Sequence, residues 1–331
     1  MQKLNIFLVG DYRTGTGPAN VTRRYKDGLP GVVAQKMRSK PLRLLELALK
    51  IPFCDIVLLS GHSAQNLYAI KIAHIWHKKA AFLMHGCVEH ENAINRVPDE
   101  KMTREERETI KEADAIYAVS TRFASWLMAQ YPAIKEKVSA VPNGIDLAEH
   151  AKEGVKDPHG ILSIGGGMPR KGIKTIAQAV MILRKDPAYA DTVLTVIGAK
   201  GADSEEIDAY PCVRDLGLVS HERTLELLTE TALFVQNSCF ETFGLSPLEA
   251  LSCGASLLLS REVGALEVFG APLAGDLIED TYDASEIAQK MKKLLERSNH
   301  DRLLSSIDTE SVSWDKRCSL LTEKLQTLAN K

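Results

Sequence analysis

A chain of 331 residues is long enough for two domains, each with a core of its own. Its composition is 45% hydrophobic and 25% charged with a net charge of −2, which fits an ordinary globular protein and argues against nucleic-acid binding. No apolar run reaches the ~18–20 residues of a membrane span. The six cysteines form no CxxC pair, which argues against a zinc site and favours reduced thiols in the cytoplasm.

Strand-like and helical segments alternate in the first half of the chain. We expect strands at 4–10, 55–60, 80–84, 115–120 and 138–141, and helices at 41–50, 66–79, 103–113 and 121–130. Such alternation predicts a parallel, doubly wound sheet that binds ligands at the carboxyl ends of its strands. Gly15, Gly17 and His85 fall at such ends. The two glycines fit either a phosphate-binding loop or a tight turn, and His85 either a proton-transfer role or a buried structural one.

A turn at 142–146 and a polar stretch up to His159 indicate a linker, after which the alternation restarts. Strands are expected at 160–165, 192–198, 232–236 and 255–259, and helices at 173–185, 221–230, 283–297 and 313–328. The predicted fold is therefore α/β, with two Rossmann-like parallel-sheet domains at 1–150 and 151–312. A last helix at 313–331 is expected to pack back toward the N-terminal domain.

Two carboxylates frame the segment from Phe240 to Ala250. Glu249 fits a capping box in which Ser246 is the N-cap and Pro247 the first helical residue. Glu241 directly follows a predicted strand, where an unpaired buried carboxylate would be costly, so a functional role is favoured for it. A carboxylate at this place can accept hydrogen bonds from sugar hydroxyls or stabilise positive charge on an anomeric carbon.

Arg170 and Lys171 follow a glycine loop and precede a predicted helix, a position that favours gripping a diphosphate. A solvated pair of cations on a turn is the alternative. The loop lacks the GxxxxGK[ST] pattern of P-loop ATPases, and neither glycine loop has the spacing of a nicotinamide dinucleotide site.

Cations are concentrated near the N-terminus, where eight lysines and arginines between 22 and 50 face only Asp27 and Glu46. A solvated surface explains such a run, and so does an anionic surface partner. The stretch from Arg23 to Arg43 is the candidate contact.

In motif order and spacing, most of the chain resembles the retaining glycosyltransferases of family 4, which have the GT-B fold. The segment from Glu241 through Gly244 and Leu245 to Glu249 is similar to the E-x7-E signature of that family, and Lys171-Gly172 to its phosphate grip. The segment 141–146 resembles the residues before the family's linker. Gly165 departs from the pattern, because it stands where the family usually carries an arginine.

The resemblance implies two facing domains and a role for each motif. Glu241 would contact the hydroxyls of the donor sugar, Glu249 the ribose, and Lys171 the diphosphate. Gly244 and Leu245 would line the donor site, with Arg170 as a substitute for the missing arginine. Gly15 and Gly17 would close over the phosphates, and His85 would lie near the sugar on the acceptor side. No metal or other cofactor is expected.

The expected activity is transfer of a hexose-type residue from a nucleotide diphosphate sugar to an acceptor hydroxyl, with retention at the anomeric carbon. A saccharide or lipid-linked saccharide would be the acceptor, in bacterial surface polysaccharide or glycolipid synthesis. The enzyme would be cytoplasmic, with the basic stretch resting on an anionic membrane. Two rivals are a sugar-nucleotide epimerase or hydrolase of the same fold and a non-catalytic nucleotide-sugar or saccharide-binding protein.

Overall fold

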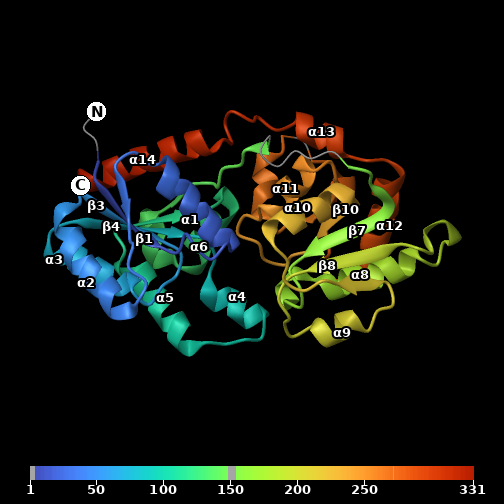
Figure 1. Cartoon of the computed structure of the whole chain (residues 1–331), viewed down its shortest axis with the longest axis horizontal. Coiled ribbons are helices and arrows are strands. Elements are labelled where there is room, and N and C mark those ends of the chain that lie inside the picture. The colour runs from blue at the N-terminus through green and yellow to red at the C-terminus, as the bar shows by residue number, and fades with distance from the viewer. Residues whose placement is uncertain (1–3, 148–153, 271) are drawn as a thin grey trace. The chain divides into compact units, whose positions relative to one another are not determined.

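The computed structural model describes residues 4–147, 154–270 and 272–331, which divide into two compact units (Figure 1). The first unit comprises Met1–Asn92, Pro98–Gly144 and Glu310–Lys331, and the second comprises Ala93–Val97 and Ile145–Thr309. Each unit has one six-stranded parallel sheet, which confirms the predicted α/β class. Residues 148–153 of the expected linker lie outside the described residues.

The sheet of the first unit has the strand order β2-β1-β3-β4-β5-β6. Its strands are β1 (Ile6–Gly10), β2 (Val32–Ala34), β3 (Ile56–Ser60), β4 (Lys79–Met84), β5 (Ala115–Ala118) and β6 (Val138–Ala140). Its helices are α1 (Gly17–Gly28), α2 (Lys40–Lys50), α3 (Asn66–Ile75), α5 (Glu100–Glu112), α6 (Thr121–Gln130) and α14 (Trp314–Ala329), and α4 (Val88–Ile94) crosses the unit boundary. Parallel crossovers are right-handed, so the reversal of direction after β2 places α1 on one face of the sheet and α2 and α3 on the other.

The inner strands of this sheet are apolar because both of their faces are covered. Every residue of β3 is buried, and Ile56 to Ser60 pair in register with Ile6 to Gly10 of β1 and Lys79 to Leu83 of β4. This register brings the ends of β1, β3 and β4 to one edge. The residues that follow those strands are consequently neighbours.

The C-terminal helix α14 packs on α1 of the first unit. The indole of Trp314 meets the ring of Tyr25 edge to face, with centroids 5.5 Å apart. Gly144 leaves the space for this indole, since a Cβ there would lie 2.8 Å from Cδ2 of Trp314. The last helix therefore belongs to the core of the first unit.

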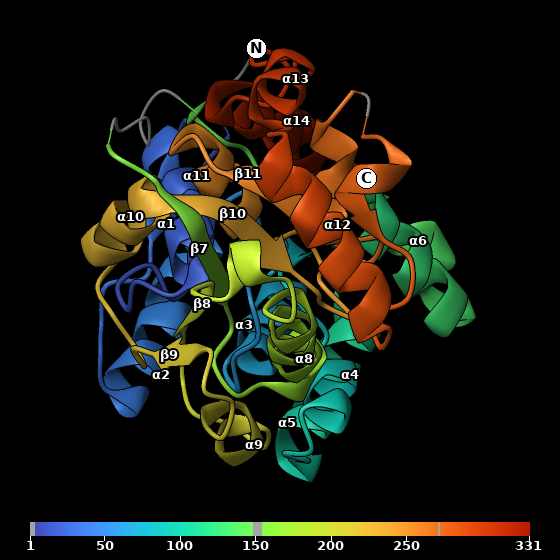
Figure 2. The same ribbon diagram turned by 90° about the vertical axis from the view of Figure 1, so that its right-hand side faces the viewer.

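The sheet of the second unit has the strand order β12-β11-β10-β7-β8-β9. Its strands are β7 (Asp157–Ile164), β8 (Val193–Ile197), β9 (Val213–Asp215), β10 (Thr231–Gln236), β11 (Ser256–Ser260) and β12 (Leu277–Ile278). Its helices are α8 (Ile173–Leu183), α9 (Ser204–Asp208), α10 (His221–Glu230), α11 (Ser246–Ser252), α12 (Ala284–Glu296) and α13 (His300–Ser305). Helices α8 and α12 pack together on one face and α10 and α11 on the other (Figure 2).

Most expected elements are present, and the differences lie at boundaries, in short pieces and at the 12-residue helix α1, which was not predicted. Helix α3 ends at Ile75 rather than at residue 79, because Lys79 already begins β4. Strand β7 begins at Asp157, inside the polar stretch expected to be linker. The short elements β2, α4, α9, β9, β12 and α13 were not predicted. Within the described ranges, no helix combines the length and the apolarity that crossing a membrane requires.

Candidate functional site

Glu241 lies just past the carboxyl end of β10, in a cluster of charged side chains. Its carboxylate is only 11% exposed and accepts a hydrogen bond from Nζ of Lys171. One guanidinium nitrogen of Arg170 lies 3.4 Å from the same Oε2 and also donates to the backbone carbonyl of Phe240, at 3.2 Å. The structure thus brings together Glu241, Lys171 and Arg170, which sequence analysis placed in separate motifs.

The electrostatics of this cluster keep Glu241 ionised. Burial by itself raises the pKa of Glu241, but the charges and hydrogen bonds of Lys171 and Arg170 outweigh it and hold the pKa below its usual value. Two cations and one anion leave the cluster with one net positive charge. Such a site favours an anionic ligand group.

Two polar residues at the end of β10 support the cluster, and sequence analysis missed both. Nε2 of Gln236 donates to Oε2 of Glu241 at 3.0 Å. Nδ2 of Asn237 donates to the carbonyls of Gly172 and Thr281, so it ties the start of α8 to the end of β10. Both side chains are buried. A Gln-Asn pair that directly follows an apolar strand is the signal that could have identified them.

Gly244 turns the chain beside Glu241. Its φ is +85°, and a Cβ there would lie 3.1 Å from Cγ of Glu241 and 3.2 Å from Nε2 of Gln236. After this turn the backbone is helical from Leu245, whose carbonyl accepts from the amides of Leu248 and Glu249.

The expected capping box at Ser246 is wrong. Helix α11 begins at Ser246, with Leu245 as its N-cap and no side-chain capping bond, so Glu249 falls one position too late for that motif. The glycine turn at 244 explains the shift, because it lets the chain enter helical geometry one residue early. Glu249 remains half-buried in the first turn of this helix.

The glycine loop after β7 packs closely against Lys171. A Cβ at Gly165 would lie 2.4 Å from Cγ of Lys171, so no arginine fits there unless the lysine moves. Arg170 instead brings a guanidinium to Glu241 from the other end of the same loop. The chain thus lacks the family's arginine at position 165 and has the guanidinium of Arg170 beside Glu241.

In the first unit, Gly15 and Gly17 lie between β1 and α1. Gly15 has a φ of +75°, Gly17 is the first residue of α1, and a Cβ at either position would meet no atom within 4 Å. Thr16 caps the helix by accepting from the amide of Ala19. The loop is thus a helix-starting turn with open space above both glycines.

His85 follows β4 and ends a chain of hydrogen bonds. Oγ1 of Thr22 donates to the carbonyl of Pro18 at 2.9 Å, so Oγ of Ser60, 2.8 Å away, donates to Thr22. Nε2 of His85 lies 2.9 Å from the same Ser60 oxygen and therefore donates to it. We infer that the neutral imidazole carries its proton on Nε2 and its lone pair on Nδ1.

Comparison with known proteins identifies the family. The model "Glycosyl transferases group 1" matches residues 147–307, and the model "Glycosyltransferase Family 4" matches residues 13–149. The chain belongs to the group 1 glycosyltransferases. This assignment confirms the resemblance read from the sequence motifs.

Individual relatives of this group 1 glycosyltransferase are distant. The D-inositol 3-phosphate glycosyltransferase of Nocardia farcinica is 28% identical over an alignment of 227 positions, which covers 62% of this chain and 50% of that protein. The serotype-specific mannosyltransferase WbdA of Escherichia coli is 26% identical over an alignment of 237 positions, which covers 64% of this chain and 28% of WbdA. The chain thus spans half or less of the length of these relatives.

Among solved structures, the Anabaena protein HepE in complex with UDP and glucose superposes with a TM-score of 0.72. The match covers 98% of this chain and 100% of HepE at 13% identity, so it establishes a shared GT-B fold and no more.

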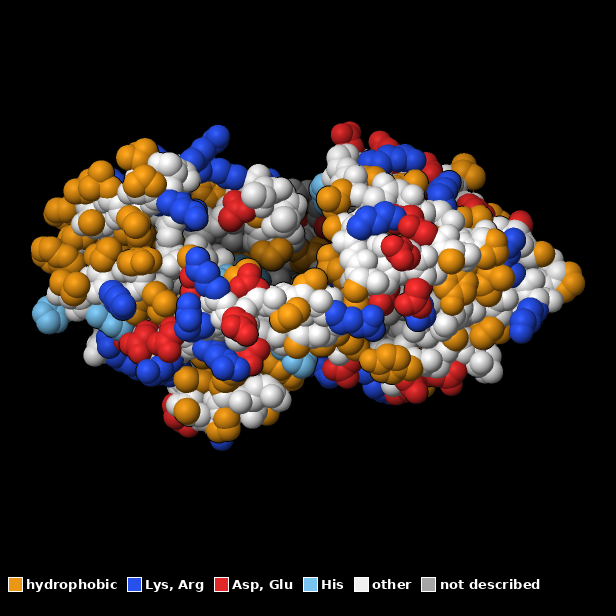
Figure 3. Space-filling model, turned by 90° about the horizontal axis from the view of Figure 1, so that it is seen from below, with side chains coloured by type: hydrophobic (Ala, Val, Ile, Leu, Met, Phe, Trp, Pro, Cys, Tyr) orange, Lys and Arg blue, Asp and Glu red, His pale blue; other side chains and the backbone are white. Residues whose placement is uncertain are grey.

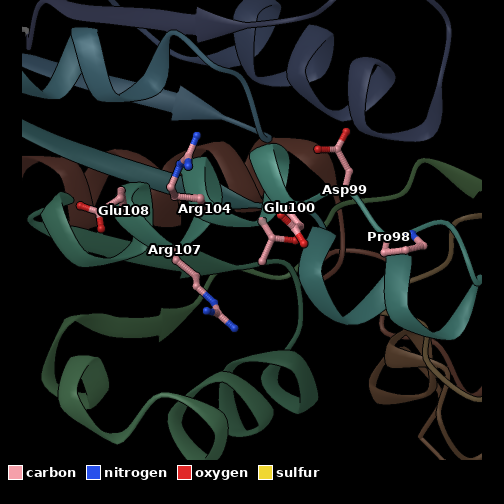
Figure 4. Close-up of a pocket in the computed structure, with 7 residues that line it drawn as sticks. Pro98, Asp99, Glu100, Arg104, Arg107 and Glu108 are labelled. Atoms are coloured by element: carbon pink, nitrogen blue, oxygen red, sulfur yellow. The ribbon is translucent and has the colours of Figure 1, made fainter.

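A shallow pocket on α5 of this group 1 glycosyltransferase lies apart from the expected site residues. Figure 4 shows side chains from Pro98 to Glu108 around it, including Arg104 and Arg107. Arg107 is paired with Glu89, and Asp99 caps α5. None of the expected site residues lines this pocket. In the described parts of the chain, no three His, Cys, Asp or Glu side chains are grouped as metal ligands.

Burial of His85 predicts a measurable pH dependence of stability. Burial lowers the pKa of His85 to about 4, whereas an unfolded histidine titrates near 6.5. The unfolded state therefore takes up a proton first as the pH falls, and stability decreases between about pH 6.5 and pH 4. Between pH 7 and pH 5 we expect this group to contribute a loss of about 1–2 kcal/mol.

Urea unfolding at pH 7 and pH 5 measures this loss. His85→Gln should remove it, whereas His221→Gln, at an exposed position on α10, should leave the difference unchanged. An equal difference in wild type and His85→Gln would show that His85 does not cause the loss.

Proposed function

We propose that this protein transfers a hexose-type residue from a nucleotide diphosphate sugar to an acceptor hydroxyl, with retention at the anomeric carbon. The observation that carries the proposal is the Glu241–Lys171–Arg170 cluster at the carboxyl end of β10. Membership of the group 1 glycosyltransferases supports it, and so does the fold shared with HepE, which was solved with UDP-glucose.

Charge balance gives each member of the cluster a role. The diphosphate of the donor competes with Glu241 for the two cations, and their charge stabilises it as the leaving group. As the bond from the anomeric carbon to the diphosphate oxygen breaks, the diphosphate departs with the electron pair. The acceptor oxygen forms the new bond, and its proton passes to the departing diphosphate oxygen. Glu241, released from Lys171, accepts hydrogen bonds from the donor sugar and stabilises positive charge at the anomeric carbon.

The remaining residues keep the roles that the family implies. Glu249, Gly244 and Leu245 belong to the donor site of the second unit, whereas Gly15, Gly17 and His85 act from the first unit. His85 keeps the role of orienting a hydroxyl or accepting a proton on the acceptor side.

The proposal also covers the acceptor, the place of action in the cell and the need for a metal. The acceptor is a saccharide or lipid-linked saccharide in bacterial surface polysaccharide or glycolipid synthesis, and the protein works at the cytoplasmic face of the membrane. Because Lys171 and Arg170 supply positive charge, no metal is required. Activity should then survive EDTA.

Thermal-shift measurements with a panel of nucleotide sugars test the donor, beginning with UDP-glucose. A ligand at 100 times its Kd should stabilise the protein by about 2.7 kcal/mol. Stabilisation by no member of the panel would contradict the proposal. Product analysis with the stabilising donor then separates the rivals. Rapid turnover without acceptor indicates an epimerase or hydrolase, and no turnover with any acceptor indicates a binding protein.

A further inference from the structure

Helix α2 turns an apolar side outward. Its exposed positions include Leu42, Leu45 and Leu49, of which the last two are 54% and 60% exposed. These positions are spaced three and four residues apart, so their side chains lie along one stripe of the helix. A helix on the surface of a globular domain ordinarily buries such a stripe.

The charged residue at the centre of this helix points inward instead. Glu46 is buried, and its carboxylate accepts hydrogen bonds from the amides of Lys36 and Met37 at 2.9–3.0 Å. Arg43 donates to Oε1 of Gln35. These contacts fix the rotation of α2, and the outward orientation of its leucines is therefore part of the fold.

The apolar surface continues beyond α2. Helix α2 contacts α3 and the 3-10 turn η1 (Ile51–Phe53), where Phe53 is 84% exposed. At the end of α3, Ile75 and Trp76 are 72% and 53% exposed. Figure 3 shows the gathering of hydrophobic side chains at this end of the first unit. We call this surface the α2–α3 apolar face; it comprises Leu42, Leu44, Leu45, Leu49, Phe53, Tyr68, Ile75 and Trp76.

Exposed cations lie on and beside the elements of this face. Lys79 is paired with Asp114, but five other cations are exposed: Lys36, Arg38, Lys40, Lys50 and Lys71. The acidic residues in the same part of the chain are Glu46 and Asp55. Glu46 is buried, and the carboxylate of Asp55 accepts from the amide of Asn5. An apolar surface rimmed by lysine and arginine matches a bilayer with anionic headgroups, whose hydrocarbon takes up the leucines and aromatics.

The cations of the basic stretch do not all belong to this surface. Arg23 and Lys26 lie on α1, on the opposite face of the sheet from α2. Lys36 and Lys40 flank the start of α2 and are exposed. Sequence analysis suggested the whole stretch from Arg23 to Arg43 as the contact with an anionic surface. Only the second half of that stretch lies beside the α2–α3 apolar face.

We propose that the α2–α3 apolar face inserts into the interfacial region of an anionic lipid bilayer. This deepens the membrane location in the proposed function, but binding to vesicles needs neither donor nor acceptor. Charge favours a bilayer over a second copy of the chain, because a two-fold contact through this face would bring two positive rims together.

Co-sedimentation with vesicles of phosphatidylcholine and phosphatidylglycerol tests the proposal. The wild type should bind these anionic vesicles, and it should bind vesicles of pure phosphatidylcholine much more weakly. Leu45→Glu/Leu49→Glu should bind at least about tenfold more weakly, because two leucines lose their place in the apolar phase. Leu218→Glu, a change at a leucine of the second unit that is even more exposed, at 80%, should bind like the wild type.

Fluorescence localises the contact. The emission of Trp76 should shift to the blue on vesicle binding, and Trp76→Phe should abolish the shift. All variants should keep the thermal stability of the wild type and its response to nucleotide sugars, which separates failure here from failure of the proposed function.

Three results would overturn the proposal. The first is no binding of the wild type to anionic vesicles at low salt, and the second is unchanged binding by Leu45→Glu/Leu49→Glu. The third is a dimer in lipid-free solution that this double variant dissociates, which would assign the face to a second copy.

Discussion

Replacing Glu241 by glutamine should lower kcat by about 10²- to 10³-fold without weakening the binding of the nucleoside diphosphate. The amide keeps the shape of the side chain but removes the charge that occupies Lys171 and Arg170. The diphosphate then no longer competes with the charge of Glu241 for the two cations, so its Kd should stay equal or fall. The sugar loses the anion that stabilises its developing positive charge.

Lys171→Met should weaken the binding of the nucleoside diphosphate as well as lower kcat. It removes the ammonium that contacts Glu241, so the Kd of the nucleoside diphosphate should rise by about tenfold or more. The measurements are steady-state kinetics and calorimetric titration with the diphosphate. A merely structural role for Glu241 would weaken binding along with kcat.

A matched control for the carboxylate is available in the same unit. Glu279 is exposed and paired with Arg261, and Glu279→Gln should change neither kcat nor Kd. Equal kcat for Glu241→Gln and wild type would contradict the role of Glu241.

Local signals in the sequence were sufficient to predict a helix where a capping residue marks its start and apolar residues recur at helical spacing. Helix α6 was predicted at its observed bounds, because Ser120 caps it and apolar residues recur behind that cap. Helix α10 was predicted equally well after Ser220. The parallel sheets followed from the alternation of such segments.

Local signals could not predict which side chains far apart in the sequence contact each other. The sequence placed Glu241 and Lys171 in separate motifs, and only the sheet order brings their side chains together. Gln236 reads as the end of a strand, and its bond to Glu241 depends on the turn at Gly244. The outward leucines of α2 were also hidden, since periodicity identifies an apolar stripe but not the direction that it faces.

The largest loss of stability should come from Asp276, which sequence analysis did not single out. Its carboxylate is buried and accepts two hydrogen bonds from Arg302, at 2.6 and 2.7 Å. It also accepts from Asn299, whose amide pairs with the backbone of Leu257 in β11. The carboxylate thus joins the edge of the sheet to α13. Asp276→Ala leaves the buried amide of Asn299 without this acceptor and removes the partner of a partly exposed guanidinium, so it should cost about 2–3 kcal/mol.

Urea unfolding measures this cost, and the chain offers a way to assign it to the second unit. All three tryptophans (Trp76, Trp126 and Trp314) lie in the first unit, so their fluorescence reports that unit, whereas circular dichroism reports both. Asp276→Ala should move the dichroism transition to lower urea. Glu279→Ala, which breaks an exposed ion pair, should cost less than about 1 kcal/mol. A loss for Asp276→Ala no larger than that of Glu279→Ala would show that the buried carboxylate does not hold the sheet edge.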